Sequence, residues 1–189
     1  MRFIDIRQDR WHRVGGEDGP VPHPDPQADR LLTLEQWHAV RGHWPHGLPT
    51  GVLLPNTVDI ETLAEDVRGG ADARLPLVVL QFPKWTDGRA YSQARVLRSR
   101  YRFAGEVRAV GDVLVDMLPL LQRTGFDAVV LRHDQDLDAA VRSLGFFPGH
   151  YQGDVRQPRP GFARDLEAEA RAATAGQRDT SGLFAGQGI

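Results

Sequence analysis

Residues 77–110 read LVVLQFPKWTDGRAYSQARVLRSRYRFAGEVRAV, and this stretch decides the fold class. Its first six residues are apolar with one exception, which predicts a strand buried on both faces. A loop with Pro83 and Gly88 follows, and apolar residues then recur at helical spacing as far as Tyr101. Residues 106–110 predict the next strand. A strand–helix–strand unit of this kind is typical of a parallel sheet.

The same alternation continues on both sides of this unit. The sequence predicts strands at 52–54 and 127–131, and helices that begin near Asn56, Asp112 and Asp136. We therefore expect an α/β domain built as a four-stranded, mostly parallel βα-repeat, with helices on both faces of the sheet. The spacing fits a half-barrel or a small open sheet equally well.

Both ends of the chain differ in composition from this repeat. Residues 3–14 predict a short hairpin or an edge strand, and the segment 15–29 is rich in glycine and proline and predicts a surface loop. Thr33 opens a first helix with a capping-box pattern, and a short helix is predicted near 165–173. The hairpin and the first helix form an N-terminal extension of the repeat. We divide the chain into an N-terminal strand or hairpin with a loop (residues 1–30), an α/β domain (31–152) and a partly disordered tail (153–189).

Composition excludes several classes of function. The chain has 189 residues, 41% of them hydrophobic, a net charge of −2 and no cysteine. Its charge gives no indication of nucleic-acid binding, and no apolar run approaches the length of a membrane span. The N-terminus lacks a signal-peptide core, so we expect a cytoplasmic protein. The absence of cysteine excludes thiol catalysis, thiolate zinc sites and cysteine-ligated clusters in this chain, and no histidine spacing predicts a metal site.

The predicted ligand site follows from the geometry of parallel sheets. Ligands in such folds bind beyond the carboxyl ends of the strands, where loops and helix N-termini meet. Arg89 stands in the first turn of a predicted helix, where a cation opposes the helix dipole, so its position indicates an acidic partner or an anionic ligand. With Ser92 it could bind sulfite, sulfate or a cofactor phosphate. The candidate anion- or ligand-binding residues are Asp87, Gly88, Arg89, Ser92, Gly111, Asp112 and Arg132.

A structural alternative applies to the same residues. Asp87, Asp112 and Asp136 each stand where a helix N-cap is expected. Arg89 would then pair with Asp112 or Glu106 and form a clasp without a ligand. The sequence contains no Walker loop and no nucleophile elbow, and it predicts neither catalytic residues nor a particular cofactor.

Two segments carry a resemblance to a known family. Residues 82–100 (FPKWTDGRAYSQARVLRSR) and 105–116 (GEVRAVGDVLVD) resemble a bacterial family of uncharacterised proteins labelled as oxidoreductases of sulfite reduction. Members are typically encoded beside assimilatory sulfite reductase. The match is dense over 82–116 and looser over 30–152, and it departs at Met117, where the family pattern has glutamine.

The resemblance implies an accessory protein of assimilatory sulfite reduction. Such a protein would bind sulfite reductase or its electron donor, with or without an oxyanion. The alternative that it leaves open is a small-molecule enzyme of the same pathway, an oxidoreductase with a non-covalent cofactor. The family supplies no established catalytic residues, and the chain has neither cysteine for a cluster nor a nicotinamide-binding fingerprint.

Overall fold

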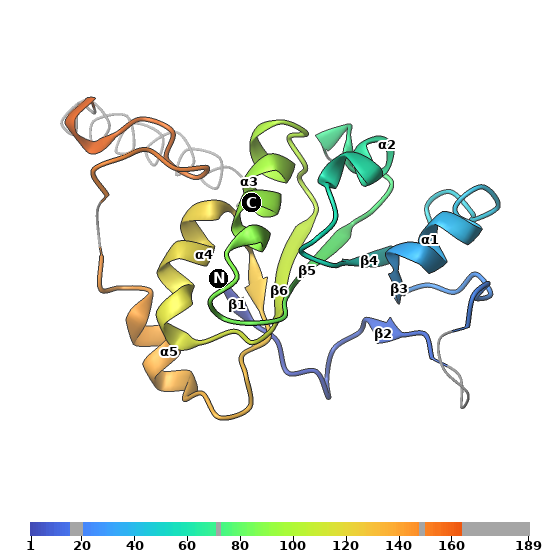
Figure 1. Cartoon of the computed structure of the whole chain (residues 1–189), viewed down its shortest axis with the longest axis horizontal. Coiled ribbons are helices and arrows are strands. Elements are labelled where there is room, and N and C mark those ends of the chain that lie inside the picture. The colour runs from blue at the N-terminus through green and yellow to red at the C-terminus, as the bar shows by residue number, and fades with distance from the viewer. Residues whose placement is uncertain (16–20, 71–72, 148–149, 164–189) are drawn as a thin grey trace, which may run out of the picture. The chain divides into compact units, whose positions relative to one another are not determined.

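The computed structural model describes residues 1–15, 21–70, 73–147 and 150–163 (Figure 1). The chain divides into two units, Met1–Pro148 and Gly149–Ile189. The described part of the second unit contains a short 3₁₀ helix, Gly161–Ala163, and a contact between the rings of Tyr151 and Phe162. The helix predicted near 165–173 lies outside the described residues.

The first unit is built on one parallel sheet. Hydrogen-bonded neighbours follow the order β1-β7-β6-β5-β4-β3-β2, and every pair is parallel. The prediction of a parallel α/β sheet is confirmed, but the sheet has seven strands and not four. The strands are β1 Arg2–Phe3, β2 His12–Arg13, β3 Arg30–Thr33, β4 Thr50–Leu54, β5 Leu77–Phe82, β6 Glu106–Gly111 and β7 Ala128–Val129.

The three additional strands lie at the edges of the four that were predicted. β3 was missed because its four residues run directly into the first helix. Of the two alternatives for residues 3–14, the hairpin is wrong and the edge strand is confirmed. β1 pairs with β7 and β2 with β3, so residues 4–11 carry the chain from one edge of the sheet to the other (Figure 1). This strand order is that of a βα-barrel opened between β1 and β2, which favours the half-barrel arrangement over a small open sheet.

The helices are α1 Leu34–Val40, α2 Ala64–Val67, α3 Arg89–Ser99, α4 Leu118–Thr124 and α5 Leu137–Ser143. Helices α1, α3 and α5 begin close to the predicted positions, whereas α2 and α4 begin later than predicted, after the 3₁₀ turns Ile60–Leu63 and Val115–Met117. Thr33 and Gln36 form the predicted capping box of α1, and the side chain of Asp136 accepts a hydrogen bond from the backbone N–H of Ala139 to cap α5. Asp112 does not cap a helix, because α4 begins at Leu118 with Pro119 in its first turn.

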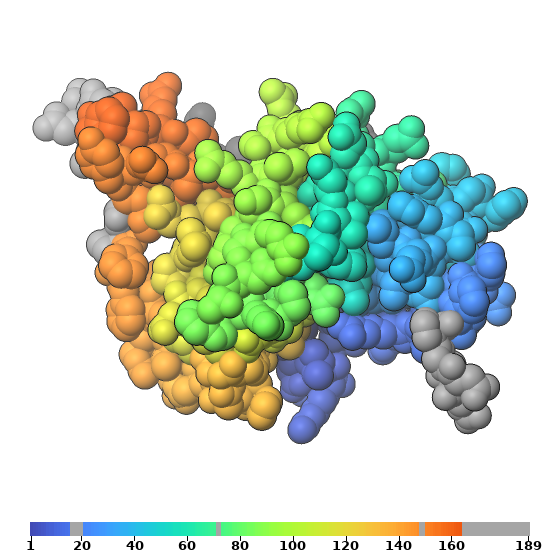
Figure 2. All heavy atoms as spheres, in the orientation of Figure 1, coloured from blue at the N-terminus to red at the C-terminus, as the bar shows by residue number. Residues whose placement is uncertain are grey.

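The five α-helices of the described residues cover the same face of the sheet, whereas helices on both faces were predicted. The main core joins Trp37 of α1, Leu97 of α3 and Leu121 of α4 to alternate strand residues such as Val78 and Val107. Consecutive right-handed crossovers between neighbouring strands place every helix on one side. In Figure 2 the region that includes α3 lies between the α1–α2 region, coloured blue to teal, and the α4–α5 region, coloured yellow to orange.

The opposite face, which we call the inner face, is covered by the N-terminal segment 4–13. Trp11 from this segment packs on Leu31, Leu77 and Val79 in a small second cluster. Other strand residues at this face, such as Leu53 and Val110, are only half-buried. The sheet is therefore apolar on both faces, as its sequence indicated, although helices cover only one of them.

Candidate functional site

All strands are parallel, so the loops that follow them meet at one edge of the sheet, here called the carboxyl edge. This confirms the geometric premise of the predicted site. Asp87, Gly88, Arg89 and Ser92 lie at the start of α3 after β5. Gly111 ends β6, while Asp112 and Arg132 lie in the loops after β6 and β7.

Asp87 and Arg89 form a bidentate ion pair at this edge. Arg89 donates from Nε to Asp87 Oδ1 at 2.9 Å and from Nη2 to Oδ2 at 2.6 Å. This pair holds the pKa of Asp87 far below its ordinary value and raises the pKa of Arg89. The Arg89 side chain is 57% exposed, so its guanidinium faces solvent as well as the carboxylate.

The N-cap residue of α3 supplies no side-chain cap, although Asp87 Oδ1 accepts a hydrogen bond from Arg89 N at 3.3 Å. Gly88 occupies the N-cap position, and the first turn holds no acidic residue. Nearby, the Asn56 side chain is only 6% exposed, and no acceptor among the described residues lies within hydrogen-bond distance of its Nδ2. The Asn56 amide is close enough to contribute to the lowered pKa of Asp87. The α3 N-terminus thus combines backbone donors, a guanidinium and a buried amide donor.

A second ion-pair group lies on the loops after β6 and β7. Asp112 accepts from Trp85 N at 2.9 Å and from Arg132 Nη1 at 2.6 Å. Arg132 also donates to both oxygens of Asp134, from Nε at 2.6 Å and from Nη2 at 2.8 Å. The hydrogen bond from Trp85 and the Arg132 guanidinium lower the pKa of Asp112, and Arg132 lowers that of Asp134.

The structure therefore places the predicted residues in two groups instead of one. Arg89 contacts Asp87, so the clasp to Asp112 or Glu106 does not form. Asp112 pairs with Arg132. Ser92 makes no side-chain hydrogen bond within the described part of the chain. The loop 83–88 connects the groups, because it carries Asp87 and also the Trp85 N–H that binds Asp112.

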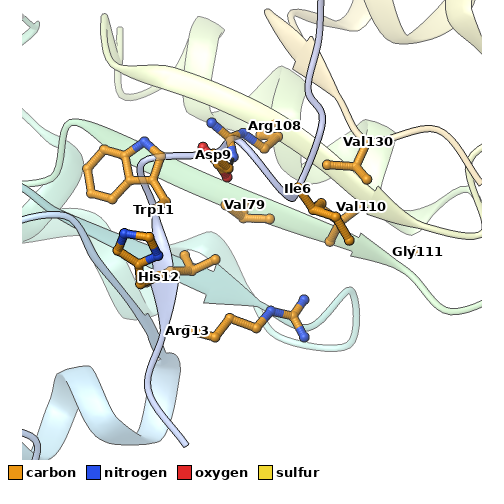
Figure 3. Close-up of a pocket in the computed structure, with 11 residues that line it drawn as sticks. Ile6, Asp9, Trp11, His12, Arg13, Val79, Arg108, Val110, Gly111 and Val130 are labelled. Atoms are coloured by element: carbon orange, nitrogen blue, oxygen red, sulfur yellow. Dashed lines mark hydrogen bonds and ion pairs between the residues drawn. The ribbon is translucent and has the colours of Figure 1, made fainter.

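A cavity of about 510 Å³ lies on the inner face, and we call it the inner-face pocket (Figure 3). Side chains from the N-terminal segment lie on one side of it and side chains from the sheet on the other. Gly111 is the predicted site residue that lines it. The lining residues are Ile6, Asp9, Trp11, His12, Arg13, Leu31, Val79, Arg108, Val110, Gly111 and Val130.

A buried arginine borders the inner-face pocket. Arg108 is only 3% exposed, and it donates from Nε to Glu106 at 2.8 Å and from Nη1 to Asp9. Glu106 also accepts from Arg2 at 2.5 Å. Arg108 was not a predicted site residue, although a charge in the middle of the apolar run Val107–Val110 was a usable signal. Asp9 and Trp11 carried no such signal.

A further polar group lies between α1 and α2. Asp66 is 2% exposed and accepts hydrogen bonds from Trp37 Nε1 at 2.9 Å and Arg41 Nη1 at 3.3 Å. Arg74 forms an ion pair with it at 3.8 Å. These partners satisfy a buried carboxylate and join the two helices, which is a structural role.

Comparisons with known proteins identify a family but no activity. A family model described as "Bacterial protein of unknown function (DUF934)" matches residues 51–162. No curated protein and no solved structure matches the chain. The described residues contain no group of three or more histidine or carboxylate side chains placed to hold a metal, and none of their helices is long and apolar enough to cross a bilayer.

Proposed function

The chain belongs to the DUF934 family of bacterial proteins of unknown function, which indicates neither a substrate nor a partner, so we propose both from the residues of the chain. We propose that the protein is an accessory protein of assimilatory sulfite reduction. It binds a small oxyanion such as sulfite at the carboxyl edge and contacts sulfite reductase or its electron donor there. The resemblance over residues 82–116 supports the pathway, and the α3 N-terminus supports the ligand.

The observation that carries this proposal is the start of α3, where the N-cap residue Gly88 has no side chain and Arg89 stands in the first turn. In an ordinary helix a polar side chain at the N-cap accepts hydrogen bonds from the free N–H groups. Here, among the described residues, only the Asp87 side chain accepts one of them, from Arg89 N at 3.3 Å, and the buried Asn56 amide supplies a further donor. A tetrahedral oxyanion accepts several hydrogen bonds at once, which suits such a set of donors.

Asp87 sets the strength of this site. The Asp87 carboxylate already accepts two hydrogen bonds from the Arg89 guanidinium. An oxyanion therefore has to share the guanidinium with Asp87 or displace the Asp87 carboxylate from it. Because Arg89 is more than half exposed, the side chain can turn toward a ligand without leaving a buried group unpaired. We therefore expect weak, reversible binding of an anion at a concentration that a pathway intermediate reaches.

The same edge offers a surface for a protein partner. Trp85 is 56% exposed and stands beside Lys84, the only lysine in the chain. Its backbone is fixed by Asp112, so the exposed indole is presented from an ordered loop. Exposed tryptophans on ordered loops are frequent anchors of protein interfaces. Contact through Trp85 would place the partner next to the oxyanion site.

Calorimetric titration with sodium sulfite, and separately with sulfate, tests the ligand. The expected result is binding to the wild type and a loss of affinity of about tenfold or more in Arg89→Ala, since a charge-assisted contact is removed. Tm should stay within about 2 °C of the wild type, because the Asp87–Arg89 pair is exposed. Arg100→Ala, at the other end of the same helix, is the matched control, since its pair with Glu61 is also exposed. Equal binding by Arg89→Ala and the wild type would reject the site.

Co-purification with tagged sulfite reductase tests the partner. Wild-type protein should be retained, Trp85→Ala should be lost, and Phe146→Ala, which removes an equally exposed aromatic ring elsewhere, should be retained. Retention of Trp85→Ala at the wild-type level would show that the interface lies elsewhere.

The inner-face pocket favours the second candidate, an oxidoreductase of the same pathway with a non-covalent cofactor. A cavity of about 510 Å³ is within the usual range for small-molecule sites. The visible absorbance spectrum of the purified protein distinguishes the two candidates. A stoichiometric flavin band would favour the enzyme, and a colourless protein would favour the accessory role.

A further inference from the structure

We propose that the inner-face pocket is a binding site for a flat aromatic molecule that carries an anionic group. This site is separate from the carboxyl-edge site and does not depend on the pathway proposed above. Three features of the pocket identify the ligand: its apolar walls, the charge balance at its buried end and the arginine at its rim.

The pocket has apolar walls on two sides. Val110 of β6 and Val130 after β7 line it from the sheet, Ile6 lines it from the N-terminal segment, and Trp11, packed on Val79, closes one side (Figure 3). Ile6 is 70% exposed although it faces a cavity. A ligand between Ile6 and the sheet would remove this apolar surface from water, and a sheet face with an indole beside it favours a flat aromatic ring.

The buried end of the pocket is electrically balanced. Arg108 binds the carboxylates of Asp9 and Glu106, and Arg2 binds Glu106 as well. Two arginines and two carboxylates leave no net charge here. Because these charges are already paired, the buried end can accept the neutral polar edge of a ring system, and it does not require a charged ligand group.

Arg13 gives the rim of the pocket a positive charge. It lies on β2 next to His12, and both residues line the pocket and are exposed. Within the described residues the Arg13 guanidinium has no hydrogen-bond or ion-pair partner, so its five donors are available. A guanidinium binds phosphate, sulfonate and carboxylate groups in a bidentate manner. A ring between the apolar walls would therefore direct its anionic substituent toward β2.

Fluorescence titration with three probes tests this assignment. Flavin mononucleotide and riboflavin share one ring system and differ in the phosphate, while anilinonaphthalene sulfonate is a smaller aromatic anion. We expect both anions to bind and to quench Trp11, and riboflavin to bind about tenfold more weakly than its phosphate. Failure of both anions to bind at about 1 mM would overturn the proposal.

Two substitutions locate the bound probe. Arg13→Gln should weaken flavin mononucleotide about tenfold and leave riboflavin unchanged, whereas Arg7→Gln, in the same segment but outside the pocket, should change neither. Val110→Glu places a carboxylate on the pocket wall and should weaken both anions, with Val141→Glu on the exposed side of α5 as control. Unchanged binding of flavin mononucleotide by Arg13→Gln would overturn the anion contact. This test does not depend on Val110→Glu, so it stands even if that variant fails to fold.

The same variants separate this site from the sulfite site. Arg13→Gln should leave the sulfite titration unchanged, and Arg89→Ala should leave quenching by flavin mononucleotide unchanged. The two proposals can therefore fail independently of each other.

Discussion

Gly111→Ala should destabilise the protein by about 3 kcal/mol and lower Tm by about 6–12 °C. Gly111 has φ = +101°, where a residue with a Cβ costs about 1–2 kcal/mol. A Cβ built there would lie 2.3 Å from the carbonyl oxygen of Phe82, which is backbone of the central strand β5 and cannot move aside. That oxygen accepts the 2.8 Å hydrogen bond from Asp112 N, so relief of the clash would displace the loop after β6.

Gly88→Ala is the matched control at the same edge of the sheet. Its φ is −80°, and the nearest atom to a Cβ there is 3.6 Å away in the Tyr91 ring. Its stability should change by less than about 1 kcal/mol. The assay is thermal unfolding followed by circular dichroism, with urea unfolding as a second measurement. If Gly111→Ala and Gly88→Ala unfold at the same temperature, the backbone at the end of β6 is not constrained as described, and the reasoning fails.

Three further outcomes follow from the polar groups. Asp66→Ala should lower the free energy of unfolding in urea by about 2–4 kcal/mol. The substitution leaves Trp37 Nε1 without its acceptor and two partly exposed arginines without their partner. A loss below about 1 kcal/mol would contradict this reasoning. Because the pKa of Asp87 is lowered in the folded state, its stabilisation is present above its ordinary pKa of 3.8 and lost as pH falls further. The difference in Tm between wild type and Asp87→Asn should therefore shrink below about pH 4, and a constant difference would refute the assignment. Burial raises the pKa of Tyr91 to about 12, so tyrosinate absorbance should show a step near pH 12 that Tyr91→Phe lacks, and stability should decline as pH rises above 10.

The sequence predicted those parts of the fold that local patterns determine. The strands β4, β5, β6 and β7 each form an apolar run that ends in a loop, and each was placed within a few residues. Capping by Thr33 and Asp136 was also predicted, because a cap depends only on residues within one turn. The segment of β1 and β2 was predicted only as a hairpin or an edge strand, because each of these strands forms two residues of ladder, too few to show a period.

The candidate site was harder to predict because it depends on pairs that are distant in the sequence. The parallel arrangement brought the predicted loops to one edge, but nothing local indicated that Arg89 would pair with Asp87 while Arg132 paired with Asp112. The sequence did not predict the inner-face pocket, although Gly111 was a predicted site residue and Arg108 stood out in an apolar run. The pocket exists because residues 4–11 cross the sheet. This crossing brings Asp9 into contact with Arg108, although the two residues are far apart in the sequence.

Gly111 is the point at which the two proposed sites meet. It lines the inner-face pocket, and its neighbour Asp112 holds the loop of Trp85 and Arg132 at the carboxyl edge. Displacement of this backbone by Gly111→Ala should therefore weaken both flavin mononucleotide and sulfite. Arg13→Gln should weaken only the first and Arg89→Ala only the second. If Gly111→Ala folds and weakens neither ligand, the sites do not adjoin the end of β6. If Arg13→Gln and Arg89→Ala each weaken both ligands, there is one site and not two.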